Sequence, residues 1–151
     1  MTGAIDETLK EVRREHRAFR AVVHDLQRLA ASPASAAHQQ LQQALHRFLD
    51  TWGPRLSAHL DLEERLVTPS VIHALPIETW TFDTFGRERE TFDALLDLLR
   101  EGSTWLDQDE PGAEREIAAA LDDLSLLWTR HVRRVDVIRP LLSGHEGAGH
   151  A

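Results

Sequence analysis

The stretch LSAHLDLEERL, residues 56–66, places a histidine and a glutamate four residues apart within a run of leucines. On an α-helix, positions four apart share one face, so His59 and Glu63 lie on the side that the leucines would bury. A buried imidazole or carboxylate without a polar partner costs a few kcal/mol. The stretch therefore predicts a helix whose core-facing side carries a polar site.

Outward from this stretch, apolar residues recur at three- and four-residue spacing along most of the chain. The spacing predicts helices over residues 4–31, 37–67, 78–100 and 114–142, with a kink or brief interruption at Gly53-Pro54. Residues 68–76 and 103–112 are predicted connections, and the third helix is expected to stop at Gly102. The prediction is an all-α fold, an antiparallel up-down-up-down four-helix bundle over residues 1–143, with a flexible tail at 144–151.

The composition excludes several classes of protein. The 151 residues carry a net charge of −8 and no cysteine, which removes disulfides and thiolate metal sites. An acidic chain is not expected to bind nucleic acid. Because no apolar run is long enough for a bilayer and the N-terminus shows no signal pattern, we expect a cytoplasmic protein without membrane contact.

The two halves of the sequence resemble each other. REHRAFRAVV at 14–23 aligns with RERETFDALL at 87–96, and His59 aligns with His131. The separations agree, with 43 residues from His16 to His59 and 42 from Arg89 to His131. A doubled helical hairpin predicts equivalent inward positions for His16 and Arg89, and likewise for His59 and His131.

Three of the nine histidines fall on the apolar stripes of different predicted helices, namely His16, His59 and His131. One shared metal ion would satisfy all three imidazoles. Asp136 follows His131 by five residues, about 140° around a regular helix, but Pro140 is expected to widen this turn and bring Asp136 toward the axis. The other histidines are expected on solvated or boundary faces, in a connection or in the tail: His24, His38, His46, His73, His145 and His150.

At these residues the sequence resembles the hemerythrin-like (HHE cation-binding) family. The family consists of four-helix bundles with a non-haem di-iron centre, and its pattern combines a helix 1 His, His-x-x-x-Glu on helix 2 and His-x-x-x-x-Asp on helix 4. The resemblance implies iron as the cofactor, as one or two ions with manganese or zinc as alternatives. It also implies O2, NO or peroxide as the ligand; the oligomeric state stays open. The metal ligands that it implies are His16, His59, Glu63, His131 and Asp136.

Helix 3 departs from the family pattern, because Phe85 and Arg89 stand where the family has imidazoles. If the family's two-metal arrangement is applied to this sequence, one metal site keeps most of its ligands. The other keeps only His131 and the bridging carboxylates. Arg89 has three interpretations. It could point outward and leave its place to water or Glu88. It could instead turn inward and form a salt bridge with Glu63 or Asp136, and we rank this second interpretation slightly first. A register shift by one residue would instead make Glu88 a ligand.

Two functions follow from these alternatives. The first is a metal-binding protein whose site holds one metal ion or an incomplete pair of ions. Glu64 is then expected to contact solvent or support a ligand. The second is a metal-free bundle that acts as an interaction module, with Arg89 in the former metal cavity. An enzyme ranks third, because the inward faces carry no Glu-x-x-His pair and the chain has no tyrosine.

Overall fold

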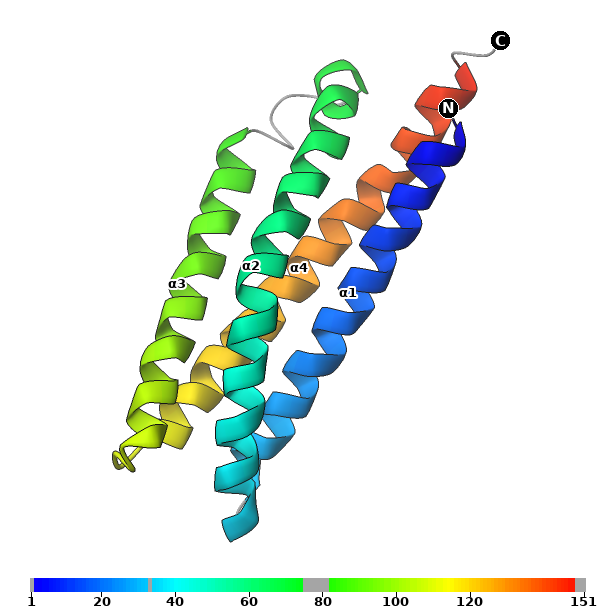
Figure 1. The fold of residues 1–151 in the computed structure, drawn as a ribbon. Helices are drawn as coiled ribbons and strands as arrows, with labels where there is room; N and C mark the ends of the chain where they lie inside the picture. Colours follow the sequence, from blue (N-terminus) through cyan, green and yellow to red (C-terminus); the bar gives the residue numbers. More distant parts are fainter. Residues whose placement is uncertain (1, 33, 75–81, 149–151) are drawn as a thin grey trace.

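The computed structural model describes residues 2–32, 34–74 and 82–148, and in these residues it contains four α-helices and no strand. They are α1 (Thr2–Ala31), α2 (Ser35–Ala74), α3 (Phe82–Asp107) and α4 (Ala113–Ala148). Neighbouring helices run in opposite directions, and α1 begins at the end of the molecule where α4 stops (Figure 1). The predicted all-α up-down-up-down bundle is confirmed.

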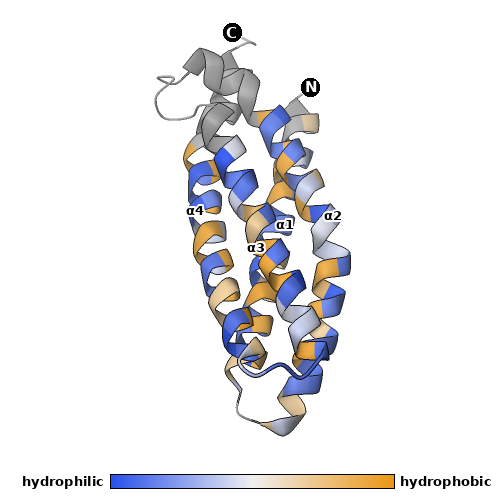
Figure 2. Cartoon of the chain, turned by 90° about the vertical axis from the view of Figure 1, so that its left-hand side faces the viewer, coloured by the Kyte–Doolittle hydropathy of each residue, from blue (hydrophilic) through white to orange (hydrophobic). Residues whose placement is uncertain are grey.

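The helices form a closed ring around one core. Each helix packs against the next along the chain, α4 returns to α1, and α2 also contacts α4 across the bundle. Hydrophilic and hydrophobic residues alternate around each helix in Figure 2, as expected of helices that bury one face. The largest fully buried side chains come from all four helices: Phe19, Leu41, Leu45, Leu56, Phe92, Leu99, Leu106, Ile117, Leu121, Leu124 and Trp128.

Helix α2 is longer than predicted and has no break. It continues through Gly53-Pro54 and past position 67 to Ala74, so a brief interruption and the predicted end are both wrong, while the alternative of a kink stays a prediction. Trp52 and Leu56 on either side of the proline are buried in the same core. Their packing holds the helix together against the cost of an internal proline, about 3 kcal/mol.

Helix α3 also continues past its predicted end. Gly102 does not terminate it, because this glycine lies where α3 meets α4 and a Cβ there would sit 2.6 Å from Cγ1 of Ile117. The glycine permits close approach of two helices. The chain turns only after Asp107, where Asp109 and Gly112 adopt positive φ angles of 53° and 84°.

Helix α4 ends at Ala148, beyond the predicted 142, and includes residues 144–148 of the predicted tail. It stays α-helical through Pro140, so the predicted widening of this turn is wrong. The predicted start of the third helix at 78 and residues 149–151 lie outside the described residues, and the division into bundle and tail stays a prediction. In the part of the chain described, no helix has the length and apolarity needed to cross a membrane.

Candidate metal centre

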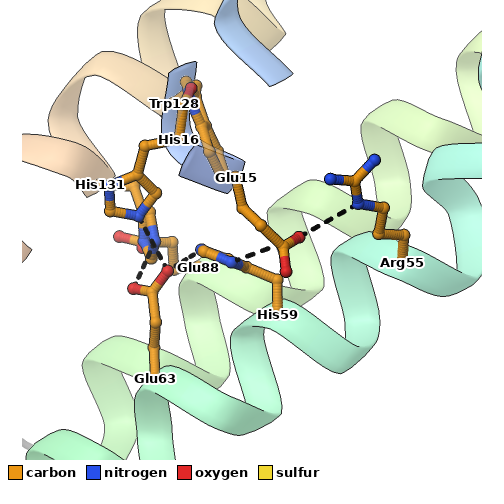
Figure 3. A network of polar contacts seen from close by, with 8 residues as sticks. All are labelled: Glu15, His16, Arg55, His59, Glu63, Glu88, Trp128 and His131. Carbon is orange, nitrogen blue, oxygen red and sulfur yellow. Dashed lines mark hydrogen bonds and ion pairs between the residues drawn. The ribbon is translucent and has the colours of Figure 1, made fainter. Parts of the chain in front are cut away.

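Three helices bring four buried metal-ligating side chains to one point inside the bundle. His16 comes from α1, His59 and Glu63 from α2, and His131 from α4. All four are buried, and each offers one nitrogen or oxygen atom that lies within 4.8 Å of the other three. Figure 3 shows the imidazoles and the carboxylate turned toward one another. The structure therefore brings together four of the five predicted ligands.

Glu63 stands at the middle of the group. Its Oε1 lies 2.9 Å from Nε2 of His16 and also contacts Nε2 of His59, while its Oε2 lies 2.8 Å from Nε2 of His131. Despite this proximity, the Oε2 and His131 Nε2 atoms are not aligned as a hydrogen bond. They remain buried without a partner, as do both ring nitrogens of His59. Leaving several buried polar atoms unpaired costs about 1–3 kcal/mol each, so the group needs a further occupant.

A metal cation fits these residues. Zinc lies about 2.0–2.2 Å from imidazole nitrogen and carboxylate oxygen, so ligands on opposite sides of such an ion are about 4 Å apart. The observed spread of up to 4.8 Å is close to this separation. Imidazole ligands suit iron and zinc, and carboxylate ligands suit manganese. The four side chains are thus of the right kind, and their ligand atoms lie close enough together, to hold one ion.

Charge within the group favours a cation as well. Burial lowers the pKa of His59 to about 4, so this imidazole is neutral at pH 7 and keeps a lone pair for a metal. Burial would raise the pKa of Glu63, but the neighbouring imidazoles of His131 and His16 outweigh it and lower this pKa to about 2. Burial likewise opposes protonation of His131, yet Glu63 and Glu88 raise its pKa to about 9. Without metal, the His131 imidazolium supplies the positive charge that the carboxylates require.

Trp128 encloses the centre on its apolar side. Its ring stacks on His131 with centroids 5.1 Å apart, and it meets His16 edge-on at 5.3 Å. The indole Nε1 donates a hydrogen bond of 3.2 Å to the His16 carbonyl oxygen. Phe19 and Phe92 pack against the indole from α1 and α3. The ligands are therefore held in an apolar, packed surrounding.

Glu88 of α3 reaches this region, and it is the residue that the register-shift alternative proposed. It is buried, and its carboxylate accepts a hydrogen bond from Nδ1 of His131 and pairs with Arg134. It thus approaches His131 on the side away from the nitrogen that faces Glu63. Glu88 is not among the four residues whose ligand atoms converge.

Arg89 does not turn inward, so the alternative that we ranked first is wrong. Its guanidinium lies 2.6 Å from Asp61 and 3.8 Å from Glu64 on the outer flank of α2, and its side chain is 30% exposed. Successive residues point about 100° apart on a helix, and α3 is rotated so that Glu88 faces the core. Glu64 therefore contacts this surface arginine.

Asp136 is not brought into the group. It is exposed on α4, which stays regular here, and it borders a surface hollow between α1 and α4 that His16 and Trp128 also line. Five residues after His131, a regular helix directs it about 140° away. Phe85 belongs to α3, but its side chain lies outside the described part of the structure.

The sequence analysis missed one residue near the ligands. Glu15 lies 3.8 Å from Nδ1 of His59 and 3.3 Å from Nε of Arg55, and the dashed lines of Figure 3 join these three residues. The internal repeat held the signal that could have revealed it, because Glu15 aligns with Glu88.

The other described histidines lie away from the centre. His24 is exposed on α1. His38 contacts Glu114 at 2.7 Å and Asp109 at 3.4 Å, and His46 contacts Asp107 at 2.9 Å, at the end of the bundle where α3 turns into α4. Their predicted placement on solvated or boundary faces is confirmed.

Comparison with known proteins points to one family. The model of the hemerythrin HHE cation binding domain matches residues 7–142, which include all four converging side chains. No curated protein and no solved structure matches the chain. Because the match extends over nearly the whole sequence and the bundle carries a buried His/Glu group, the chain belongs to the hemerythrin HHE cation-binding domain family.

Proposed function

We propose that this protein binds one non-haem iron ion through His16, His59, Glu63 and His131, and that it binds or senses O2, NO or peroxide. The observation that carries the proposal is the set of four buried, converging ligand atoms, several of which have no hydrogen-bond partner within the described chain. Domains of this family bind metal cations, and the His/Glu group is where this chain would hold one.

One ion is favoured over two because no α3 side chain that the structure describes is among the converging ligands. Arg89 points to Asp61 at the surface, and Glu88 is engaged with Nδ1 of His131 and with Arg134. Asp136, the bridging carboxylate that the family resemblance implied, is exposed. The centre therefore corresponds to a two-metal site that has lost the ligands of its second metal and keeps three imidazoles and one carboxylate.

Iron held by four protein ligands would keep coordination positions open and could exchange an electron with a small ligand. The protein side of the task is performed by its own residues. Trp128, Phe19 and Phe92 exclude water from the ligand side chains. A surface hollow of about 330 Å³ between α1 and α4, bordered by His16 and Trp128, brings solvent next to the centre. A small diatomic molecule would approach the centre through this hollow.

Metal analysis of the untagged protein tests the proposal. After reconstitution with Fe(II) under argon, we expect about one iron per chain by elemental analysis. His59→Ala should abolish this binding, because the variant removes a central ligand. His24→Ala is the matched control, since it removes an exposed imidazole from the surface of α1. Wild-type protein without metal above background, or an equal loss in both variants, would contradict the proposal.

The alternative function, a metal-free interaction module, depended on Arg89 filling the former metal cavity. With the guanidinium paired to Asp61 on the outer flank of α2, no observation favours that alternative.

A further inference from the structure

Two of the ligand histidines each have a further carboxylate beside the Nδ1 atom, and neither carboxylate belongs to the four-ligand group. His131 of α4 has the carboxylate of Glu88, from α3, at its Nδ1 atom. His59 of α2 has the carboxylate of Glu15, from α1, 3.8 Å from its Nδ1 atom. In each case the carboxylate comes from the preceding helix and lies on the side of the ring opposite to Nε2, the atom that faces Glu63.

Each carboxylate is also paired with an arginine on the histidine's own helix. Glu88 pairs with Arg134, three residues after His131, and Glu15 pairs with Arg55, four residues before His59. Arg55 is held in turn over the ring of Trp52, with its guanidinium carbon 4.1 Å from the ring centroid. The two arrangements are pseudo-equivalent, because Glu15 and Glu88 occupy the same position of the internal repeat.

The chemistry of an imidazole explains what such a carboxylate does. A neutral imidazole carries its proton on one nitrogen and a lone pair on the other. An acceptor-only carboxylate at Nδ1 requires the proton there, which leaves the Nε2 lone pair directed at the metal and fixes the plane of the ring. Glu88 meets this requirement fully, because it is buried and accepts a hydrogen bond from His131.

The Glu15 arrangement is looser. The 3.8 Å separation from His59 exceeds a hydrogen bond, and the Glu15 side chain is 13% exposed against 5% for Glu88. A cation at Nε2 would make the Nδ1 proton of His59 a stronger donor and draw Glu15 toward it.

We propose that Glu88 and Glu15 are positioning residues, which set the tautomer and orientation of His131 and His59 for metal binding, with Glu88 the stronger of the two. The inference rests on the proposed function for its effect on metal affinity. Glu88 thereby orients the ligand His131, whereas one alternative from the sequence made Glu88 itself a metal ligand. Loss of such a partner typically lowers metal affinity about 10- to 100-fold.

Zinc titration tests the effect on affinity, with a chromophoric chelator as competitor. Glu88→Gln should weaken Zn²⁺ binding about 10- to 100-fold, and Glu15→Gln about tenfold or less. Glu90→Gln is the matched control, because it removes an exposed carboxylate from the same helix. Arg134→Gln should give a smaller loss of affinity than Glu88→Gln, and its half-exposed position allows the protein to fold even if Glu88→Gln does not. Unchanged affinity in Glu88→Gln, or in Arg134→Gln if that variant alone folds, would overturn the inference.

Proton NMR of the metal-free protein separates this inference from the proposed function. The His131 Nδ1 proton, bonded to a buried carboxylate, should exchange slowly with solvent and resonate far downfield. Glu88→Gln, or Arg134→Gln if only that variant folds, should shift this signal or speed its exchange, while Glu90→Gln should not. If wild-type protein fails to bind iron or zinc but shows the signal and its dependence on Glu88, the proposed function fails and the positioning contact stands. If metal binds and the signal is insensitive to Glu88, the positioning role is wrong.

Discussion

The first half of the bundle, α1 and α2, and the second half, α3 and α4, follow one plan but differ in what they contribute to the centre. The first half supplies His16, His59 and Glu63, and the second supplies His131. Packing is conserved between the repeats, since the aligned residues Phe19 and Phe92 are both fully buried.

The polar residues beside these phenylalanines differ. His16 is buried, whereas the aligned Arg89 lies at the surface, and the carboxylate one residue earlier is buried more deeply in the second half. Apolar packing and the supply of metal ligands are therefore separable. Burial of the same apolar stripe holds both hairpins in the bundle, while one hairpin can exchange a ligand for a supporting carboxylate.

The largest effect on stability should come from Trp128, the aromatic side chain of the second half that packs against the ligand histidines. Trp128→Ala should lower the free energy of unfolding by about 3–5 kcal/mol, because it opens a cavity beside His16 and His131. Urea denaturation followed by circular dichroism measures this change. Trp105→Ala, at a partly exposed site of α3, is the control and should cost much less. Similar losses in both variants would mean that Trp128 is not part of the packed core.

Two glycines of helix α3, in the second half, should respond with opposite signs. Gly102→Ala should destabilise the protein by about 1–3 kcal/mol, because its Cβ would overlap Ile117 of the facing helix. Gly86→Ala should stabilise it by up to about 1 kcal/mol, since a Cβ there meets nothing within 4 Å and alanine favours a helix over glycine. Thermal unfolding of the two variants checks the signs. Restoration of stability by Ile117→Val in the Gly102→Ala background would identify the overlap as the cause.

Arg89→Ala should be nearly silent and so sharpen the contrast with His16. Its partner Asp61 is exposed, and exposed ion pairs contribute about 0.2–1 kcal/mol. A guanidinium buried against Glu63 would instead cost about 3–5 kcal/mol on removal. Urea denaturation distinguishes the two values, and a loss at the larger one would place Arg89 inside the bundle after all.

The smallest effect concerns His38 of the first half, which reaches across to Glu114 and Asp109 of the second. The hydrogen bond with Glu114 is the main cause that raises the pKa of His38 above 6.5. The stabilisation is therefore complete below pH 6.5 and is lost as pH rises through the higher folded pKa. We expect a few tenths of a kcal/mol, as for other exposed pairs. Unfolding of wild type and His38→Gln from pH 5.5 to 8.5 should show the difference shrinking with pH, and a growing difference would contradict the assignment.

Much of the fold and of the centre was predictable because it depends on local periodicity. The apolar spacing predicted four helices, and the four-residue separation of His59 and Glu63 predicted that both would face the core. The helix ends were predicted less well. Gly53-Pro54 and Gly102 resemble breaks in the sequence, but long-range packing of Trp52, Leu56 and Ile117 against other helices keeps the chain helical there.

The class of fold, the helix that carries each candidate ligand and the meeting of His16, His59, Glu63 and His131 were all predictable from the pattern of residues. The rotation of α3 about its axis, by contrast, depends on the packing of the folded bundle, and it makes Glu88 face His131 while Arg89 faces Asp61. Adjacent residues on a helix point about 100° apart, so a rotation of the helix by that angle exchanges one for the other. That rotation is set by how α3 packs between α2 and α4, which no pattern within α3 contains.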